Sequence, residues 1–248
     1  MNIIDLSNKT IIVTGAGAGI GQETAKVLSE QGAKVVILDL NQVGLDETLA
    51  MMEGNGHLCK ACDLTDFEVL SSLVKDILEQ CGLIDGLVHC AGISSRKPLN
   101  VLKADGFSKV MDVNFYSFVE LVRLSTKKKY FKDGGSIVVM SSISSIRGYK
   151  AKSEYCVSKA AVDAFVRCMA LELADRRIRV NSVMPAEVLT PLALKARETN
   201  AAVGASDFNA PLGPSDPYEV ANTIAFLLSD ATKTITGTSI LIDGGACI

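Results

Sequence analysis

The sequence predicts one α/β domain built on a parallel, doubly wound sheet with helices on both faces. Three observations support this fold class. Short apolar runs rich in β-branched residues alternate with amphipathic helical stretches along the whole chain. The first such run leads directly into a glycine-rich turn. The 248 residues, 48% of them hydrophobic, suit a single large core, and no linker or low-complexity tract interrupts them.

Seven segments read as buried strands, and they are expected at 9–14, 34–38, 57–62, 84–89, 135–140, 178–183 and 239–242. Helices are expected between them, at about 20–32, 42–53, 66–81, 103–128, 154–176 and 217–229. No clear strand occurs from about 187 to 216. A segment this long without regular structure is usually a lid or a binding loop, so we expect a substrate lid there.

The turn after the first strand reads G-A-G-A-G-I-G and predicts a phosphate-binding site. Its glycines let the backbone approach a pyrophosphate closely, and the following helix offers amide N–H groups and the positive end of its dipole. A tight β–α turn without a ligand is the alternative. The residues expected to contact a cofactor here are Gly15, Ala18, Gly19, Ile20 and Gly21.

Asp39 ends the second strand, about 20 residues beyond the turn, and Leu40 follows it. A carboxylate at this place accepts hydrogen bonds from both ribose hydroxyls of an adenosine and repels a 2′-phosphate. The turn carries Ala16 and Ala18 and no Arg or Lys. The sequence therefore predicts NAD as the cofactor, with NADP less favoured.

The ends of the third and fourth strands complete the predicted cofactor site. Asp63 and Leu64 follow the third strand, where an adenine edge is expected. Cys90, Ala91 and Gly92 follow the fourth, and such small residues let the chain pass closely beneath a cofactor.

Tyr155 and Lys159 are four residues apart in the long apolar segment near 154–176, so in a helix they share one face. A free phenol has a pKa near about 10, and a nearby ammonium lowers it toward the range useful for acid–base catalysis. Taken alone, the spacing fits an ordinary structural helix better. The same helix is apolar around most of its circumference, so we expect one side to meet a second subunit in a homodimer or homotetramer.

Composition excludes several function classes. The formal net charge of −3 gives no basic field for nucleic acid, and no apolar run approaches the length of a membrane span or a signal peptide core. The seven scattered cysteines are typical of reduced thiols in a cytoplasmic protein. Cys59 and Cys62 are expected to be structural, and no metal site is expected. Lys127–Lys129 and Lys132 form either a solvated helix end or, less favoured, a docking patch for an acidic carrier.

Together these motifs resemble the short-chain dehydrogenase/reductase family, in its branch of about this length that includes the 3-oxoacyl-carrier-protein reductases. The resemblance spans essentially the whole chain. It rests on T-G-A-G-A-G-I-G at 14–21, Asp39, Asp63-Leu64, Ala91-Gly92, Asn114, Ser142, Y-x-x-x-K at 155–159, Pro185 with Thr190, and I-T-G-T-S-I-L-I-D-G-G at 235–245. It implies a Rossmann-type sheet of strand order 3-2-1-4-5-6-7.

The resemblance also implies a catalytic tetrad of Asn114, Ser142, Tyr155 and Lys159. Ser142 would hold the substrate oxygen, with Ser141 as the neighbouring alternative, and Tyr155 would exchange a proton with that oxygen. Lys159 would lower the pKa of Tyr155 and hold the nicotinamide ribose, and Asn114 would position a water. The implied cofactor contacts add Tyr155, Lys159, Pro185, Val188 and Thr190.

The chain departs from the family pattern in three places. His89-Cys90 stands where the family often has two asparagines, and we expect His89 to be a structural substitute and Cys90 to contact the cofactor through its backbone. Ala186 replaces a common glycine and is expected to narrow the nicotinamide pocket. Pro214 stands where an arginine is common.

Three functions follow as hypotheses. The leading one is an NAD(H)-dependent oxidoreductase acting on a small secondary alcohol or its ketone. The second is a 3-oxoacyl carrier-protein reductase using NADPH, with Arg167, Arg176 and Arg177 joining Lys127–Lys129 as docking candidates. The third, given little weight, is a nucleotide-binding protein without activity.

Overall fold

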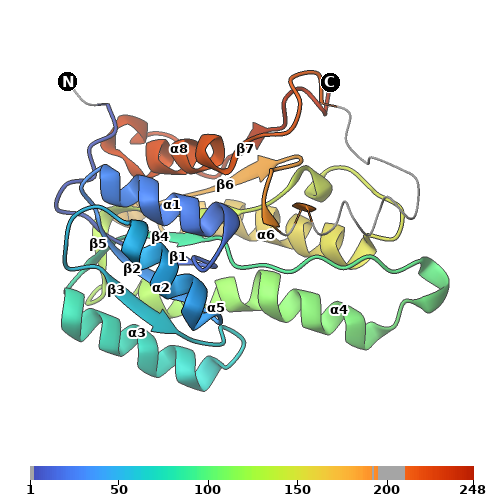
Figure 1. The fold of residues 1–248 in the computed structure, drawn as a ribbon. Helices are drawn as coiled ribbons and strands as arrows, with labels where there is room; N and C mark the ends of the chain where they lie inside the picture. The colour runs from blue at the N-terminus through green and yellow to red at the C-terminus, as the bar shows by residue number, and fades with distance from the viewer. Residues whose placement is uncertain (1–2, 192, 195–209) are drawn as a thin grey trace.

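The computed structural model describes residues 3–191, 193–194 and 210–248, and it contains a seven-stranded sheet of order β3-β2-β1-β4-β5-β6-β7 (Figure 1). Every neighbouring pair of strands is parallel. The predicted fold class and strand order are therefore confirmed. The strands are β1 (Thr10–Thr14), β2 (Lys34–Asp39), β3 (Leu58–Ala61), β4 (Ile84–His89), β5 (Phe131–Met140), β6 (Arg179–Pro185) and β7 (Ser239–Ile242).

Helices connect successive strands. The longer ones are α1 (Gly19–Glu30), α2 (Gln42–Met51), α3 (Phe67–Cys81), α4 (Ala104–Met111), α5 (Ser117–Ser125), α6 (Ser153–Glu172) and α8 (Pro217–Leu228). Short helical turns are η1 (Leu99–Val101), η2 (Asp112–Tyr116), η3 (Ile143–Ser145), η4 (Ala174–Arg176) and η5 (Asp230–Thr232), of which η2 is a π-helix turn.

Two predicted elements differ from the structure. The helix expected over 103–128 is divided by the π turn η2 and ends at Ser125. The strand expected from residue 135 begins at Phe131, which pairs with Ile84. The register then shifts, so that Gly86 pairs with Ser136. The glycines before Ser136 obscure the start of this strand, because glycine weakens a strand pattern and often marks a bulge.

The sheet is buried on both faces, which is why its strands read as continuous apolar runs. Ile12 and Val36 belong to a core cluster with α3, α5 and α6. Ile11, Val13 and Val35 belong to a second cluster with α1 and α8. Neighbouring residues enter different clusters because successive strand side chains point to opposite faces. Figure 1 shows α1 and α8 side by side on one of these faces.

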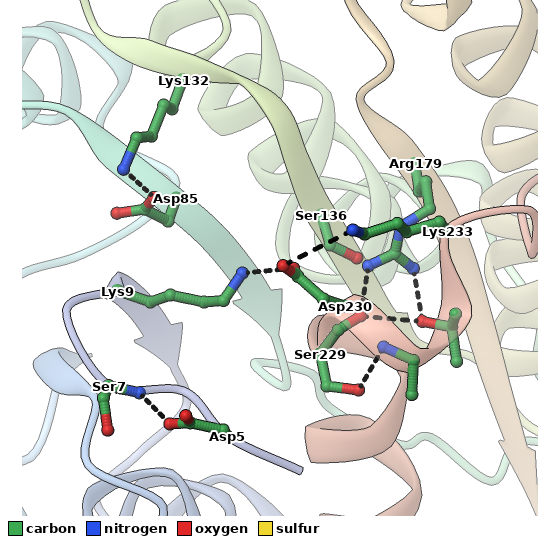
Figure 2. A network of polar contacts seen from close by, with 12 residues as sticks. Asp5, Ser7, Lys9, Asp85, Lys132, Ser136, Arg179, Ser229, Asp230 and Lys233 are labelled. Carbon is green, nitrogen blue, oxygen red and sulfur yellow. Dashed lines mark hydrogen bonds and ion pairs between the residues drawn. The ribbon is translucent and has the colours of Figure 1, made fainter. Parts of the chain in front are cut away.

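A polar network fixes the amino-terminal edge of the sheet (Figure 2). Lys9 Nζ lies 2.7 Å from an Asp230 carboxylate oxygen. Arg179, buried at the start of β6, donates from Nη1 to the Leu227 carbonyl at 2.6 Å and to Thr232 Oγ1 at 2.8 Å. The bond to Leu227 satisfies a carbonyl at the end of α8. The network thereby anchors α8 at the edge opposite the carboxyl ends of the strands.

The two ends of the expected lid come together beside β6. Val188 and Ser215 form a parallel bridge, and the Leu189 amide donates to the Ser215 carbonyl at 3.0 Å. The centre of the expected lid, 195–209, lies outside the described residues. Across the described part of the chain, no helix combines the length and apolarity that crossing a membrane requires.

Candidate active site

A cavity of about 920 Å³ opens where the carboxyl ends of β1 to β4 meet. This is the edge at which open α/β sheets bind ligands. Most of the predicted cofactor contacts line it, namely Gly15, Ala18, Gly19, Ile20, Gly21, Asp39, Leu40, Asp63, Leu64, Cys90, Ala91, Gly92 and Thr190.

The glycine turn forms a close backbone cradle at this cavity. Gly15 has a φ of +67°, and a Cβ there would lie 2.7 Å from the Ala91 amide nitrogen. A Cβ on Gly21 would lie 2.1 Å from the Gly15 carbonyl oxygen. No side chain caps α1, and its first turn carries no acidic residue. The amides of that turn are therefore available to an anionic group, and the site fits the pyrophosphate of a dinucleotide.

Asp39 lies at the cavity beside this turn. Its Oδ2 accepts a hydrogen bond from the Gly17 amide at 3.0 Å, and its Oδ1 accepts one from the Asn41 amide at 2.9 Å. The carboxylate packs so closely that a Cβ on Gly17 would lie 2.9 Å from its Cγ. Two backbone bonds thus hold the negative charge at the cavity wall, where it disfavours a second anion.

The Tyr155 and Lys159 side chains both arise from α6, and Lys159 Nζ lies 5.7 Å from the centroid of the Tyr155 ring. The ammonium donates a 2.7 Å hydrogen bond to the Met140 carbonyl at the end of β5. Burial lowers the pKa of Lys159 to about 8. Burial also raises the pKa of the half-buried Tyr155, against the opposing effect of its hydrogen bond with Ser142.

The downward shift expected for the pKa of Tyr155 is not found. We predicted that the Lys159 ammonium lowers the pKa of the Tyr155 phenol. In the structure the pKa of Tyr155 is raised, because desolvation outweighs the hydrogen bond with Ser142. The Lys159 ammonium donates its hydrogen bond to the Met140 carbonyl.

Ser142 lies at the start of η3, where its Oγ accepts a hydrogen bond from the Ser144 amide at 3.1 Å. Ser142 is also the serine that hydrogen-bonds with Tyr155. The hydroxyl of Ser141 is buried and makes no hydrogen bond with the described part of the chain. This arrangement favours Ser142 over Ser141 as the partner of the phenol.

Asn114 occupies the π turn η2 and is fully buried. Its Oδ1 accepts from the Ile93 amide at 2.8 Å, and its Nδ2 donates to the Ile93 carbonyl and to Ser158 Oγ, both at 3.0 Å. Asn114 Oδ1 and Lys159 Nζ lie 3.3 and 3.6 Å from the position a Cβ on Gly92 would take. Asn114 therefore holds the backbone beside Gly92, close to the Lys159 ammonium.

Asn114, Ser142, Tyr155, Lys159, Pro185 and Val188 are predicted site residues that do not line the cavity itself. The first four lie beyond its Gly92 end. Pro185 ends β6, and the Thr190 amide donates to the Val188 carbonyl at 2.8 Å. The cavity is also lined by residues that were not predicted to contact a cofactor, namely Cys62, Thr65, Ile93, Asp105, Ser108, Lys109, Asp112, Val113 and Pro191. The spacing of Asp105, Lys109 and Asp112 along one helix face is the signal that could have identified part of this set.

The two unusual residues at the end of β4 have distinct environments. His89 Nδ1 lies 3.0 Å from Thr14 Oγ1, and its Nε2 lies 3.4 Å from Ser117 Oγ, so the imidazole joins β1 to α5. Burial lowers the pKa of His89 to about 3, which keeps the ring neutral. Burial raises the pKa of the Cys90 thiol to about 12, and the Cys90 amide donates to the Thr14 carbonyl.

Comparison with known proteins places this arrangement in a family. Residues 15–247 match a family model described as enoyl-(acyl carrier protein) reductase. The chain is 34% identical to a 3-oxoacyl-[acyl-carrier-protein] reductase of Thermotoga maritima, over 98% of this chain and 99% of that protein. It is 31% identical to an NAD-dependent glycerol dehydrogenase of Listeria innocua, over 98% and 96% of the two chains.

Solved structures agree with these relatives. A short-chain dehydrogenase/reductase from Brucella melitensis, described as a glucose/ribitol dehydrogenase, superposes with a TM-score of 0.90 at 28% identity, over 99% of each chain. The described fold therefore has a counterpart among proteins described as dehydrogenases. The chain belongs to the short-chain dehydrogenase/reductase family.

Proposed function

We propose that this protein is an NAD(H)-dependent oxidoreductase that interconverts a small secondary alcohol and its ketone, with Tyr155 as the general acid/base. One observation carries the proposal. Tyr155, its partner Ser142 and the buried Lys159 gather beyond the Gly92 end of a cavity whose wall also holds the Asp39 carboxylate. Asp39 would hold the adenosine ribose of a dinucleotide, and Lys159 would hold its nicotinamide ribose beside Tyr155.

Each side chain has a defined task in this proposal. Tyr155 gives a proton to the substrate oxygen in reduction and takes it in oxidation. Ser142 hydrogen-bonds with the phenol and donates to the substrate oxygen as charge develops there. Lys159, held by its hydrogen bond to the Met140 carbonyl, places a positive charge near the phenol and is proposed to hold the nicotinamide ribose. Asn114 holds the Ile93 backbone, which forms part of the cavity wall that would face the cofactor.

A bound nicotinamide supplies the hydride acceptor or donor for this chemistry. The residues proposed to hold the cofactor are those of the glycine turn, Asp39, Leu40, Asp63, Leu64, the segment 90–92, Lys159 and the 185–190 segment. Asp39 supports NAD over NADP, because a 2′-phosphate would approach a carboxylate already fixed by two backbone amides. The Listeria innocua relative is described as NAD-dependent.

A second candidate is a 3-oxoacyl carrier-protein reductase, favoured by the relative from Thermotoga maritima. The exposed Lys127–Lys129 offer a basic face for an acidic carrier. Arg176 does not belong to that face, because it is largely buried and pairs with Asp133 at 2.7 Å. This candidate requires reduction of a carrier-bound 3-oxoacyl group with NADPH. The third reading, a nucleotide-binding protein without activity, requires cofactor binding with no turnover of any substrate.

We also propose that the protein is a cytoplasmic homo-oligomer, a dimer or a tetramer. All seven cysteines are unpaired, as expected in a reducing compartment. On α6 the stripe containing Val162 and Val166 is buried against the sheet, whereas Val157 is 49% and Leu171 81% exposed. An exposed apolar helix face of this kind suits a subunit contact. A monomeric mass by light scattering at micromolar concentration would contradict this proposal.

The function is tested with purified protein and a panel of sugars, polyols, hydroxy acids, hydroxysteroids and a 3-oxoacyl carrier substrate. Each is assayed with NAD(H) and NADP(H) by following the absorbance of the reduced nicotinamide. We expect turnover of at least one secondary alcohol or ketone with a preference for NAD(H). A preference for NADPH together with the carrier substrate supports the second candidate, and cofactor binding without turnover supports the third.

A further inference from the structure

Glu154, the residue before Tyr155, carries a buried carboxylate that the proposed reaction does not use. Its side chain is 1% exposed and lies between α4 and the segment 93–98 that follows β4. Glu154 Oε1 lies 3.2 Å from Lys97 Nζ, and Oε2 accepts a hydrogen bond from Ser95 Oγ. The carboxylate therefore joins the first turn of α6 to a segment more than fifty residues earlier in the chain.

The neighbouring helix α4 is shaped to admit this ion pair. A Cβ on Gly106 would lie 2.2 Å from Glu154 Oε1 and 2.8 Å from Lys97 Nζ. Glycine inside a helix costs about 1 kcal/mol relative to alanine. A cavity of about 470 Å³, lined by Lys97, Gly106 and Glu154 among others, adjoins the pair. Gly106 therefore lowers the stability of α4 but leaves room for two charges beside the first turn of α6.

The segment 93–98 is held at both ends. At its inner end the Ile93 backbone makes two hydrogen bonds with the Asn114 carboxamide. At its outer end the Lys97 amide donates to the Ala151 carbonyl at 2.7 Å, and the Lys97 ammonium pairs with Glu154. Ile93 also lines the dinucleotide cavity. The segment therefore connects Glu154, the neighbour of Tyr155, with Ile93 at the cavity wall.

Stability alone is a weak reason for such a pair. Glu154 is buried, but the Lys97 side chain is 45% exposed, and an ion pair with an exposed partner contributes little net stability. The pair instead fixes a geometry, because a carboxylate accepting from two side chains of one segment has few alternative positions.

We infer that Glu154 is a positioning residue: with Lys97 and Ser95 it fixes the first turn of α6, and hence Tyr155, against the wall of the cofactor cavity. This inference rests on the proposed function of Tyr155. The positioning role depends on the contact between Glu154 and Lys97 being made. It does not depend on the charge of either residue acting on the phenol at a distance.

The test uses two variants with opposite charge changes, Glu154→Gln and Lys97→Met, and their combination. A positional role lowers kcat in both variants by about tenfold or more, because small misplacements of catalytic groups are costly. The double variant loses about as much as either single one, since both break the same contact. An electrostatic role moves kcat in opposite directions in the two variants and overturns the inference. Lys75→Met, which breaks the exposed pair with Glu79, is the matched control and leaves kcat unchanged.

Activity is measured with the panel substrate that the wild-type protein turns over fastest, and kcat is expressed per NADH-binding site. NADH affinity is expected to stay within about twofold of wild type, because no member of the contact lines the dinucleotide cavity. If Glu154→Gln does not fold, Ser95→Ala removes a single hydroxyl and reports on the same contact, with a smaller loss of kcat.

Hydrogen–deuterium exchange of the NADH complex provides a readout that needs no substrate. The Lys97 amide is expected to exchange at least about tenfold faster in both charge variants and unchanged in Lys75→Met. Unchanged exchange overturns the inference even if no panel substrate is found. Tyr155→Phe is assayed in parallel. Full activity in Tyr155→Phe refutes the proposed function, whereas loss of activity there with normal kcat in both charge variants refutes only the role of Glu154.

Discussion

Lys159 is bound to the sheet and not to the phenol it is expected to assist: its Nζ donates to the Met140 carbonyl at 2.7 Å and lies 5.7 Å from the centroid of the Tyr155 ring. A single carbonyl does not compensate a fully desolvated ammonium, and burial accordingly lowers the pKa of Lys159 to about 8. The charge is held at a cost to stability, as is common where a group is arranged for catalysis.

Replacing Lys159 with methionine should stabilise the protein and abolish its activity. The pKa of Lys159 falls from 10.5 in the unfolded chain to about 8 in the fold, which corresponds to about 3 kcal/mol of native-state cost below pH 8. Losing the bond to Met140 offsets about 1 kcal/mol of the gain.

The pH dependence of unfolding tests whether the desolvated Lys159 charge is the cause of this gain in stability. Between about pH 8 and 10.5 the unfolded state binds the Lys159 proton and the folded state does not, so wild-type stability rises with pH. The advantage of Lys159→Met in urea unfolding should therefore be largest at pH 7 and shrink toward pH 10. A variant less stable than wild type at pH 7 contradicts this account, and Lys75→Met serves as the control for removing an exposed lysine.

His89 should make the fold sensitive to mild acid. Burial lowers the pKa of His89 from 6.5 to about 3, so the unfolded chain binds a proton across this interval and the folded chain does not. The stability that His89 contributes is complete above pH 6.5 and declines as the pH falls, by about 2 kcal/mol between pH 7 and pH 5.

In His89→Asn this decline should disappear, although the absolute stability is lower because contacts with Thr14 and Ser117 change. Urea unfolding at several pH values between about 7 and 5 measures the slope, and His57→Asn is the control for the other histidine. Parallel slopes for wild type and His89→Asn would show that another group causes the acid sensitivity.

Gly15 should tolerate no side chain. Alanine at this position would place its Cβ 2.7 Å from the Ala91 amide nitrogen, at a φ of +67° that L residues rarely adopt. We expect Gly15→Ala to lower NADH affinity by about 100-fold or to prevent folding, because backbone must move on one side of the cradle. Gly148→Ala is the matched control, since its Cβ meets no atom within 4 Å and its φ is not positive. Equal NADH affinities of the two variants would show that the backbone around Gly15 does not bind the cofactor.

Asp39 should determine the choice between the two nicotinamide cofactors. Wild-type protein is expected to bind NADH at least about tenfold more tightly than NADPH, because the fixed carboxylate repels a 2′-phosphate. Asp39→Ser retains an acceptor for the Gly17 amide and removes the charge, so the preference should fall to about twofold or less. Fluorescence titration with both cofactors measures the ratio. Tighter NADPH binding by the wild type would contradict the assignment.

The parts of the site that depend on local chemistry were predictable from the sequence. The glycine turn was predicted because close backbone approach requires glycine, and the structure brings Gly15 against Ala91 as expected. Asp39 was predicted because it ends a strand, and it lies at the cavity. Asn114, Ser142, Tyr155 and Lys159 were named from the order and spacing of motifs, and their catalytic roles remain predictions.

The relations that depend on tertiary contacts were not predictable. The direction of the Tyr155 pKa shift depends first on the burial of the phenol and then on its hydrogen bond with Ser142, and the helical spacing specifies neither. The ion pair of Glu154 with Lys97 joins residues 57 positions apart and follows no periodic pattern. The π turn containing Asn114 has no helix-breaking residue to mark it, because Asp112–Tyr116 contains neither glycine nor proline.

The central claim is that Tyr155 transfers the proton, and Tyr155→Phe tests it most directly. The substitution removes one oxygen and leaves the aromatic ring, so NADH affinity should remain within about twofold of wild type. We predict that kcat falls by at least about 100-fold, while Tyr218→Phe, at an exposed position on α8, retains full activity. A Tyr155→Phe protein that binds NADH normally and turns over substrate within about tenfold of the wild-type kcat would contradict the account.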